Sequence, residues 1–569
     1  MHVKTTRRRR GDKTYEYLSL VESVRTGSKV GHRTLVRLGE VTALRSSGEL
    51  ERIVAALEAH LHRERLDVAA LEAEAAPSLG SVAAVGAVWQ RLGLDDWFTR
   101  IGGQRGAERL GDAVFAMVAN RLVDPCSKRR LPEWSEADVV MPQGWVGPSL
   151  DQYYRALDAV AAAKEATETE LFVRLCDLTN MDLRFVCYDL TSTYFEGATG
   201  PSERFPSRAF GYSRDKRGDR PQIVIGLLCT GDGIPIAHHV FTGNTNDAAT
   251  LPGVLADLAE RFGVGRICVV ADRGLISTAN VEFADEAGFD HILATRLHRD
   301  ATCAQALRSA EAASTDAWVD VPEANSRVLE VALDDGVRAV VVESDARHRR
   351  DTLRTAELVA RTEAELLALE RRVRDGRLRD PAKIGRSAQR ILGASGVARL
   401  FEIEIAEGRF LYHYNEAAFD HETRLAGRYV LTTSLTPTQA CPARVLTAYR
   451  QLLDVESRFK FLKDVLALRP VRHWSEQRVR GHIAICVYAA VIETLIDKTL
   501  TAADIPDPDL DHQHLTATRA LRELARIRRV ILTAAGRDIT LTTRPNPLQH
   551  QILTALNIDT HTWDRANIT

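Results

Sequence analysis

Near the N-terminus, apolar and polar residues alternate in a pattern that predicts a β-hairpin. Two apolar stretches between Tyr15 and Leu38 flank the turn-like sequence TGSK. In the second stretch Val36 and Leu38 fall on one face of a strand, whereas Arg33 and Arg37 fall on the other. The hairpin would therefore expose a basic face.

Helical spacing replaces this alternation after Ser47. Apolar residues recur every three or four positions from Leu50 to Leu61, and again over most of residues 78–180. The sequences DPCSKRRLPEW and MPQGWVGPS interrupt the second stretch, because their prolines and glycines end helices. We expect a first region at residues 1–76, with the hairpin and one helix, and a helical domain at residues 77–180.

Short β-branched runs mark the start of a sheet near residue 183. They are LRFVCYDLTSTYF, PQIVIGLLCT, IPIAHHVF, RICVVAD and HILATR. A tight GDG turn joins the second run to the third, and a helical segment precedes each of the last two. This order predicts a mixed α/β sheet, flanked by helices, whose first part lies in residues 181–297 and has an antiparallel and a parallel half.

The regular pattern lapses in residues 298–426, where we predict a β-rich insertion. A hairpin at VLEVALDDGVRAVVVE and a charged helix around LRTAELVARTEAELLALERRVRDG are its clearest elements. The main fold would return in residues 427–500, where a helix begins near Pro442 and carries YRQLLDVESRFKFLKDVL, followed by the apolar helix HIAICVYAAVIETLI. Residues 501–569 would form a C-terminal helical region.

Composition is that of an ordinary soluble protein. With 569 residues, 45% hydrophobic and 27% charged, the chain is long enough for several domains with buried cores. No run approaches the roughly 18 apolar residues of a membrane helix, and Glu16 and Glu22 exclude a secretory signal behind the basic N-terminus. We therefore expect a cytoplasmic protein without a membrane partner. Eight cysteines are scattered without a C-x-x-C pair, so neither disulfides nor zinc are indicated.

Charge is unevenly distributed along the chain. The formal net charge of −2 argues against a simple nucleic-acid coat, but residues 1–38 carry ten lysines or arginines against three acids. This excess favours a polyanionic partner for the N-terminal end. For Arg7–Arg10 taken alone, a solvated basic tail is an equally good interpretation. Lys128 and Arg129 lie in the first break of the helical stretch, where either phosphate contact or a solvated loop would explain them.

One aspartate stands in the middle of a strand that reads as buried. It is Asp189, within VCYDLTSTYFEG. An unpaired carboxylate costs several kcal/mol to bury, so such a residue needs a cation, a strong hydrogen-bond donor or a bend into solvent. Asp272 ends the fourth strand run of the same sheet.

The helix after Pro442 carries an acid between a phenol and two ammonium groups. Tyr449, Glu456 and Lys463 are each seven residues apart, and Lys460 follows Glu456 by four, which places them on one stripe of the helix. Taken by itself, this helix is better explained as a salt-bridged surface.

Together, however, Asp189, Asp272 and Glu456 can converge at one edge of the sheet. Two like charges about 4 Å apart repel by roughly 4 kcal/mol at an effective dielectric of 20. Three carboxylates in one place therefore call for cations. Oxygen ligands without clustered Cys or His favour Mg²⁺ or Mn²⁺ over zinc.

Three segments of the chain share a resemblance to one family. They are YDLTSTYFEG with the following GYSRDKRGDRPQIVIGLL and DGIPIAHHVFTGNTND, then VVADRGLISTAN, then YRQLLDVESRFKFLK. These segments resemble the DDE transposases of bacterial insertion sequences, in the insertion-sequence-four superfamily. The last is similar to the superfamily's Y-x2-R-x3-E-x6-K signature at Tyr449, Glu456 and Lys463, but Leu452 stands where the family has arginine. How the DNA end is gripped stays open, since Arg450, Arg458 or Lys460 could replace the missing cation.

The resemblance implies an RNase H-like catalytic core. In it Asp189, Asp272 and Glu456 would be the catalytic residues and would hold two Mg²⁺ ions, for which Mn²⁺ would substitute. The implied activity is that of a DNA transposase, which binds the terminal inverted repeats of its element, cleaves the DNA ends and joins the 3′-hydroxyls to target DNA.

The same resemblance implies partners. They would be double-stranded DNA, both transposon ends and target, and a second copy of the chain in a homodimeric synaptic complex associated with the nucleoid. The N-terminal hairpin and the helical domain would bind DNA. Side chains expected to contact DNA are Tyr449, Lys463, Lys460, Arg458, Lys216, Arg217, Arg220, Lys128 and Arg129. For the sequence SRDKRGDR, which supplies three of them, a solvated loop is nearly as good an interpretation.

Two other functions stay open from the sequence alone. A decayed transposase would recognise inverted repeats through residues 1–180 without catalysis. A metal-dependent nuclease would use the same acids but stop after hydrolysis. The presence of all three acids favours an active enzyme, and only a joined product separates a transposase from a nuclease.

Overall fold

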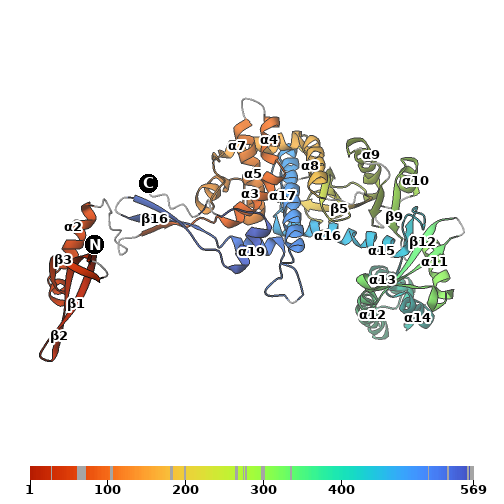
Figure 1. Cartoon of the computed structure of the whole chain (residues 1–569). Helices are drawn as coiled ribbons and strands as arrows, with labels where there is room; N and C mark the ends of the chain where they lie inside the picture. The colour runs from red at the N-terminus through yellow and green to blue at the C-terminus, as the bar shows by residue number, and fades with distance from the viewer. Residues whose placement is uncertain are drawn as a thin grey trace. The chain divides into compact units, whose positions relative to one another are not determined.

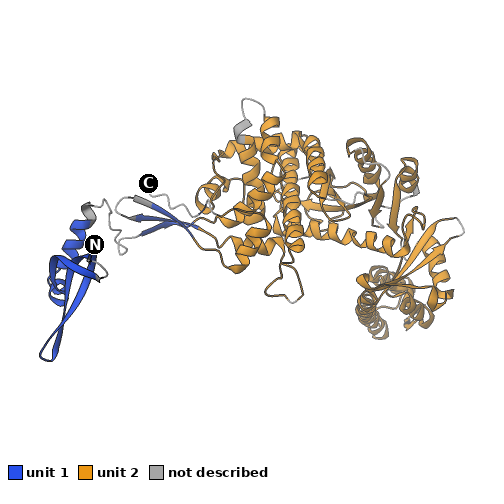
Figure 2. Ribbon diagram, in the orientation of Figure 1, with its two compact units in different colours: residues 1–76, 529–542, 563–569 blue, residues 77–528, 543–562 orange. Residues whose placement is uncertain are grey.

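The chain forms two compact units in the computed structural model (Figure 2). Residues 1–76, 529–542 and 563–569 make up unit 1, and residues 77–528 and 543–562 make up unit 2. The structure describes residues 1–26, 29–60, 72–102, 107–179, 184–197, 200–262, 267–272, 275, 278–295, 301–333, 336–510, 512–534, 537–560 and 563.

The N-terminal hairpin is part of a three-stranded antiparallel sheet in unit 1. Its strands, in spatial order, are β1 (His2–Arg10), β2 (Lys13–Thr26) and β3 (Lys29–Glu40). Gly27 and Ser28, in the predicted turn, lie outside the described residues. The four consecutive arginines are therefore strand residues of β1. The interpretation of these residues as a solvated tail is therefore wrong. The sequence did not reveal the strand because four consecutive arginines show no alternation of apolar and polar residues.

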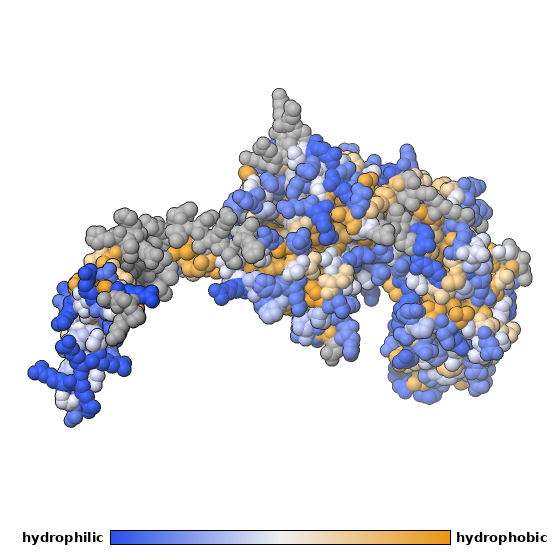
Figure 3. All heavy atoms as spheres, viewed as in Figure 1, coloured by the Kyte–Doolittle hydropathy of each residue, from blue (hydrophilic) through white to orange (hydrophobic). Residues whose placement is uncertain are grey.

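Cross-strand ion pairs join this basic sheet, and Figure 3 shows hydrophilic side chains over it. Arg7 lies opposite Glu16 at 2.7 Å, and Arg33 lies opposite Glu22 at 2.9 Å. Such exposed pairs stabilise a sheet modestly. Two helices, α1 (Val41–Ser46) and α2 (Glu49–His60), follow the sheet.

Unit 1 also contains a second sheet that the sequence did not predict. It has the order β17-β16-β4, with strands β17 (Arg537–Thr542), β16 (Arg529–Ala534) and β4 (Glu72–Ala75). Residues 501–569 are thus not wholly helical, since two of these strands belong to them. The sequence of β16, RVILTA, is rich in β-branched residues. By contrast β4, EAEA, has the composition of a helix and is a strand because it pairs with β16.

Helices fill the first and last parts of unit 2, as the spacing of apolar residues predicted. They are α3 (Gly80–Arg91), α4 (Leu94–Gly102), α5 (Ala107–Val123), α6 (Leu131–Glu133), α7 (Leu150–Ala162), α8 (Lys164–Leu178), α17 (Glu476–Ala502), α18 (Ala517–Leu524) and α19 (Pro547–Ala555). Helix α17 lies among α3, α5 and α7 (Figure 1). This helix is long and apolar enough to cross a membrane, but 94% of its most hydrophobic 18-residue stretch is buried inside the protein, as expected of a core helix.

A nine-stranded mixed sheet runs through unit 2. Its order is β10-β11-β12-β15-β9-β8-β5-β6-β7. The strands are β5 (Phe185–Tyr194), β6 (Gln222–Thr230), β7 (Pro235–Thr242), β8 (Cys268–Ala271), β9 (Asp290–Ala294), β10 (Val319–Val321), β11 (Ser326–Ala332), β12 (Arg338–Ser344) and β15 (Arg428–Thr433). Strands β5, β6 and β7 pair antiparallel, whereas β5, β8 and β9 pair parallel. This is the mixed sheet that the sequence predicted.

The two faces of β5 have different neighbours. Val186, Tyr188 and Leu190 belong to a core cluster with residues of α9 (Leu251–Phe262) and α10 (Thr278–Glu286). Successive side chains of a strand point to opposite faces, so Asp189 points away from that cluster. On its side the sheet is covered by α16 (Leu452–Lys460), which contacts β5 and β6.

The predicted insertion is more helical than its sequence indicated. Three of its strands, β10, β11 and β12, extend the main sheet through β15, and two others, β13 (Phe401–Ala406) and β14 (Arg409–Tyr414), form a small separate sheet. Its helices are α11 (Ala301–Ala312), α12 (Asp345–Arg374), α13 (Pro381–Ser395) and α14 (Glu416–Leu425). The description as β-rich is therefore corrected to mixed α/β.

A buried charge network connects the helical part of unit 2 to the edge of the sheet. Glu168, on α8, is 2% exposed and lies 2.7 Å from His238 Nδ1 on β7, 3.0 Å from Lys164 and 2.9 Å from Arg261 on α9. Burial alone raises the pKa of Glu168, but these three partners together outweigh it and lower the pKa to about 2.

Candidate active site

Strand register brings the two predicted aspartates together. Tyr188 of β5 pairs with Ala271 of β8 in a parallel ladder. If the register continues by one residue, Asp189 stands level with Asp272, which directly follows β8. Neighbouring strands lie about 4.8 Å apart, and level residues of a parallel pair point to the same face.

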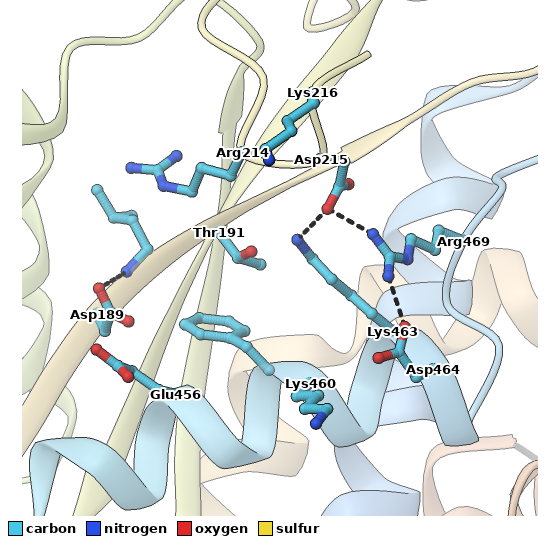
Figure 4. A pocket seen from close by; sticks show the side chains of 12 residues that line it. Asp189, Thr191, Arg214, Asp215, Lys216, Glu456, Lys460, Lys463, Asp464 and Arg469 are labelled. Carbon is cyan, nitrogen blue, oxygen red and sulfur yellow. Dashed lines mark hydrogen bonds and ion pairs between the residues drawn. The ribbon is translucent and has the colours of Figure 1, made fainter. Parts of the chain in front are cut away.

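Glu456 reaches the same place from α16. The helix packs on β5, and Figure 4 shows the carboxylates of Asp189 and Glu456 facing each other. Asp189 also accepts a hydrogen bond at 2.7 Å from the backbone N–H of Leu190. Asp189 and Glu456 thus face each other, and Asp272 lies near enough to act on both carboxylates electrostatically.

The electrostatics of the acids reflect this proximity. Burial, opposed by the Leu190 N–H and reinforced by Glu456 and Asp272, raises the pKa of Asp189 to about 7. Burial and then Asp272 also raise the pKa of Glu456. Both shifts mean that the negative form is disfavoured in this environment, and a nearby cation would restore it.

The three acids fit a divalent metal ion by donor type and by charge. Their ligands are carboxylate oxygens, which Mg²⁺ and Mn²⁺ prefer. Within the described part of the chain, no three His, Cys, Asp or Glu side chains stand close enough to hold one ion together. A shared ion would therefore require the three side chains to draw closer than they lie here.

A cavity of about 480 Å³ opens beside Asp189 and Glu456. Its charged lining comprises Asp189, Arg214, Asp215, Lys216, Glu456, Lys460, Lys463, Asp464 and Arg469. Asp189 and Glu456 form an acidic end, and Lys216, Lys463 and Arg469 lie on the other side with Asp215 and Asp464, whereas the side chain of Arg214 extends toward the side of Asp189 (Figure 4). An acidic end next to a basic one suits a substrate that is a phosphate ester, since metal and phosphate would each meet opposite charge.

Lys463, which the sequence predicted to contact DNA, belongs to this basic end, but it is not a free cation. Its Nζ lies 2.8 Å from Oδ1 of Asp215, and the same oxygen lies 2.6 Å from Nη1 of Arg469. Arg469 Nη2 lies 2.5 Å from Asp464. Burial lowers the pKa of Lys463, and Asp215 opposes that effect.

The expected single helix carrying Tyr449, Glu456 and Lys463 is broken in two places. Tyr449 is on α15 (Pro442–Arg450), Glu456 is on α16, and Lys463 lies in a π-helical turn, Phe461–Val465. Tyr449 does not line the cavity, although burial, Asp272 and Glu456 all raise its pKa. It therefore lies next to the acids rather than in the basic end.

Arg458 points away from the cavity. It pairs with Glu493 of α17, which is 4% exposed, and lies 3.8 Å from Asp497. Lys460, two residues later, lines the cavity. The two cations of α16 thus differ in surroundings, because residues two apart on a helix point to different sides.

Of the three cations in SRDKRGDR that the sequence predicted to contact DNA, one lines the cavity. Lys216 lines the cavity. Arg217 instead pairs with Asp219 at 2.8 Å and lies over the ring of Tyr194, and Arg220 lies 3.3 Å from Asp219.

Lys128 is not on the surface, so the prediction of a phosphate contact is wrong for this residue. It is 5% exposed. Burial, and after it the charge of Arg121, lowers the pKa of Lys128 to about 7. Arg129, next to it, is exposed. A charged sequence motif alone does not reveal which member turns inward.

Sequence reasoning missed Asp215, Arg214, Asp464 and Arg469, which also line the cavity. Arg214 pairs with Asp247 at 2.5 Å. Asp215 lies in SRDKRGDR, the segment in which the sequence indicated only the cations as DNA contacts. An acid between Arg214 and Lys216 is typical of a solvated loop with balanced charges. Arg469 follows the end of the expected helix, where no spacing pointed to the site.

Comparison with known proteins identifies two family regions. The IS1634 family transposase N-terminal domain matches residues 3–70, and the transposase DDE domain matches residues 181–492, more than half of the chain. Among solved structures, the cryo-EM structure of a piggyBac transposase synaptic complex with hairpin DNA is similar at 11% identity and a TM-score of 0.35, covering 78% of this chain and 79% of that chain. No curated protein sequence matches this one.

Proposed function

This chain belongs to the DDE transposase family, and on that premise we propose that it binds the terminal inverted repeats of its insertion sequence, cleaves the DNA ends and joins their 3′-hydroxyls to target DNA. The observation that carries the proposal is the pairing of Asp189 with Glu456 at one end of a cavity whose other end is basic. Family membership by itself would leave open whether this copy keeps a working site.

In the proposed chemistry, Asp189, Asp272 and Glu456 hold two Mg²⁺ ions, for which Mn²⁺ substitutes. When bound, the ions supply Lewis-acid activation of a water or 3′-hydroxyl and stabilise the charge on the leaving oxygen. The raised pKa values of Asp189 and Glu456 support this assignment, because a site with crowded carboxylates gains most from a divalent cation.

The chain's own cations would orient the DNA strand. Lys460, Lys463 and Lys216 line the basic end and would contact phosphates on either side of the reacting one. Charge there also offsets the repulsion between DNA and the acids. Tyr449, beside Asp272 and Glu456, would contribute from the adjacent wall rather than from the cavity itself.

Double-stranded DNA would be held over a larger surface than the cavity. The sheet β1–β3 carries Arg7–Arg10 and further basic residues on strands, which is a suitable footprint for phosphates. Because two transposon ends must be joined together, we infer a homodimer in a synaptic complex, working on nucleoid DNA in the cytoplasm.

The experiment is a donor-excision assay. The protein is expressed beside a marker flanked by the native terminal repeats, with Glu456→Gln as the inactive variant and Asp454→Asn as a matched control. Asp454 is on the same helix but outside the cavity lining. Excision and reinsertion by wild type and Asp454→Asn, lost in Glu456→Gln, would support the proposal. Cleaved ends without joined product would indicate a nuclease, and repeat binding without cleavage would indicate a DNA-binding protein.

A further inference from the structure

Asp215 occupies a position that the transposase chemistry described above does not use. Its side chain is 5% exposed, and Oδ1 accepts from both Lys463 Nζ at 2.8 Å and Arg469 Nη1 at 2.6 Å. Its other oxygen, Oδ2, is buried and has no hydrogen-bond partner among the described residues. A buried carboxylate of this kind is stable only while its cations stay in place.

The residues joined by Asp215 come from two separate parts of the fold. Asp215 lies in the connection between β5 and β6, whereas Lys463 and Arg469 follow α16. The contact therefore ties the strand that carries Asp189 to the segment behind the helix that carries Glu456 (Figure 4). Any change in this contact would alter how the basic end of the cavity lies relative to the acids.

Lysine in particular needs such a partner. Its ammonium group sits on a flexible four-carbon stem, so a free lysine samples many positions and loses entropy when it is fixed on a phosphate. Lys463 is 10% exposed and already held, and Arg469 is held twice, by Asp215 and by Asp464. Lys463 and Arg469 are thus held in place by contacts within the protein itself.

This order has an electrostatic cost. A carboxylate in the cavity repels the phosphates of DNA, so Asp215 weakens the general attraction that Lys463 and Arg469 would otherwise exert. A group that lowers DNA affinity while fixing two cations is expected to serve the orientation of those cations rather than the strength of DNA binding.

We propose that Asp215 is a positioning residue for strand joining, which holds Lys463 and Arg469 so that they meet a DNA phosphate in a fixed geometry relative to Asp189 and Glu456. Asp215 itself does not touch the DNA. The proposal deepens the function proposed above and rests on it.

The test compares Asp215→Ala with Asp219→Ala, measuring both binding to non-specific duplex DNA and the rate of joining of pre-cleaved ends. Asp219 is a matched control because it lies in the same loop and carries the same charge, but is 61% exposed and outside the cavity lining. We expect both variants to bind duplex DNA about 2- to 5-fold more tightly at low salt. Joining should fall at least about 10-fold for Asp215→Ala and stay unchanged for Asp219→Ala.

Tighter binding combined with slower joining is the distinguishing result, because a loss of folding would lower both. The isosteric Asp215→Asn should show the same combination if the larger change destabilises the protein. In a Lys463→Gln, Arg469→Gln double background, Asp215→Ala should add less than about 2-fold to the joining defect, since both residues that it positions are already gone. Unchanged joining in Asp215→Ala, or full additivity with the double substitution, would overturn the proposal.

A further readout does not depend on activity. The rate at which an amine-reactive acylating reagent modifies Lys463, followed by mass spectrometry, should rise several-fold in Asp215→Ala and stay unchanged in Asp219→Ala. If the wild type makes no joined product, the proposed function fails, and the labelling then decides separately whether Asp215 holds Lys463. Equal labelling in wild type and Asp215→Ala would refute the inference even in an active enzyme.

Discussion

Replacing Asp189 with asparagine should make the metal-free protein more stable. Asparagine is nearly isosteric, and its side-chain oxygen can still accept the 2.7 Å hydrogen bond from the Leu190 N–H. What the substitution removes is the negative charge that burial, Glu456 and Asp272 all disfavour. Charged groups crowded into a functional site commonly lower stability in this way.

The magnitude follows from the pKa of Asp189. A rise from 3.8 to about 7 spans about 3 pH units, and each unit is worth about 1.4 kcal/mol, which makes about 4 kcal/mol in full. Partial solvent exposure screens the charge, so we expect about 2–4 kcal/mol. Because the pKa is raised, the folded protein binds the proton more tightly than the unfolded chain does. The favourable contribution is therefore complete below pH 3.8 and is lost as the pH rises to about 7.

The assay is urea unfolding in EDTA at pH 8 and at pH 4, followed by tryptophan fluorescence. Asp189→Asn should raise the midpoint at pH 8, and most of the difference should vanish at pH 4, where Asp189 is protonated in the wild type. Asp219→Asn is the control, because Arg217 lowers the pKa of that exposed carboxyl and its removal should give no gain. An Asp189→Asn variant no more stable than wild type at pH 8 would refute the reasoning about the acid cluster.

Three more outcomes are expected. Glu168→Gln should destabilise the protein by about 3–5 kcal/mol because it leaves buried cations unpaired. In the wild type the pKa of Glu168 is lowered to about 2, so the stabilisation that this carboxylate provides is present above pH 4.5 and is lost as the pH falls toward 2. Acid unfolding of the wild type and the variant would check both statements. Arg458→Ala should lower the stability by about 3–5 kcal/mol because it leaves buried Glu493 without its partner, and it should not change the salt dependence of DNA binding. Lys460→Ala should reduce the slope of the logarithm of the binding constant against the logarithm of salt concentration by about 1. Equal changes in this slope for the two variants would contradict the assignment of Lys460, and not Arg458, to the DNA-facing side. Mn²⁺ titration calorimetry should show binding to wild type at least about 10-fold tighter than to Glu456→Gln, and equal affinities would remove Glu456 from the ligand set.

Much of the site could be predicted from local sequence because its determinants are local. The two-residue period of a strand places Asp189 on the face opposite to that of Val186 and Tyr188. The free-energy cost of burying an unpaired carboxylate indicated that this aspartate has a special role. Asp272 ends a strand run, and Glu456 lies in a segment with a recognisable signature. Such patterns depend on residues a few positions apart, so they survive without knowledge of the fold.

The surroundings of those acids could not be predicted in the same way. Four consecutive arginines formed a strand because β1 pairs with β2, and EAEA formed one because β16 returns to it from the far end of the chain. Lys128 turned inward, although its neighbour Arg129 is exposed. Pairing and burial of this kind are set by segments that lie far away in the sequence.

The sequence by itself indicated the three acids of the candidate site and the five strands, β5 to β9, of the sheet beneath them. Tertiary structure alone decided which cations face the acids: Arg458 turned to Glu493, while Lys463 was captured by Asp215 from a loop that precedes it by more than two hundred residues. The physical reason is that a charge acts through its distance to other charges in space, and sequence spacing fixes that distance only within a single helix or strand.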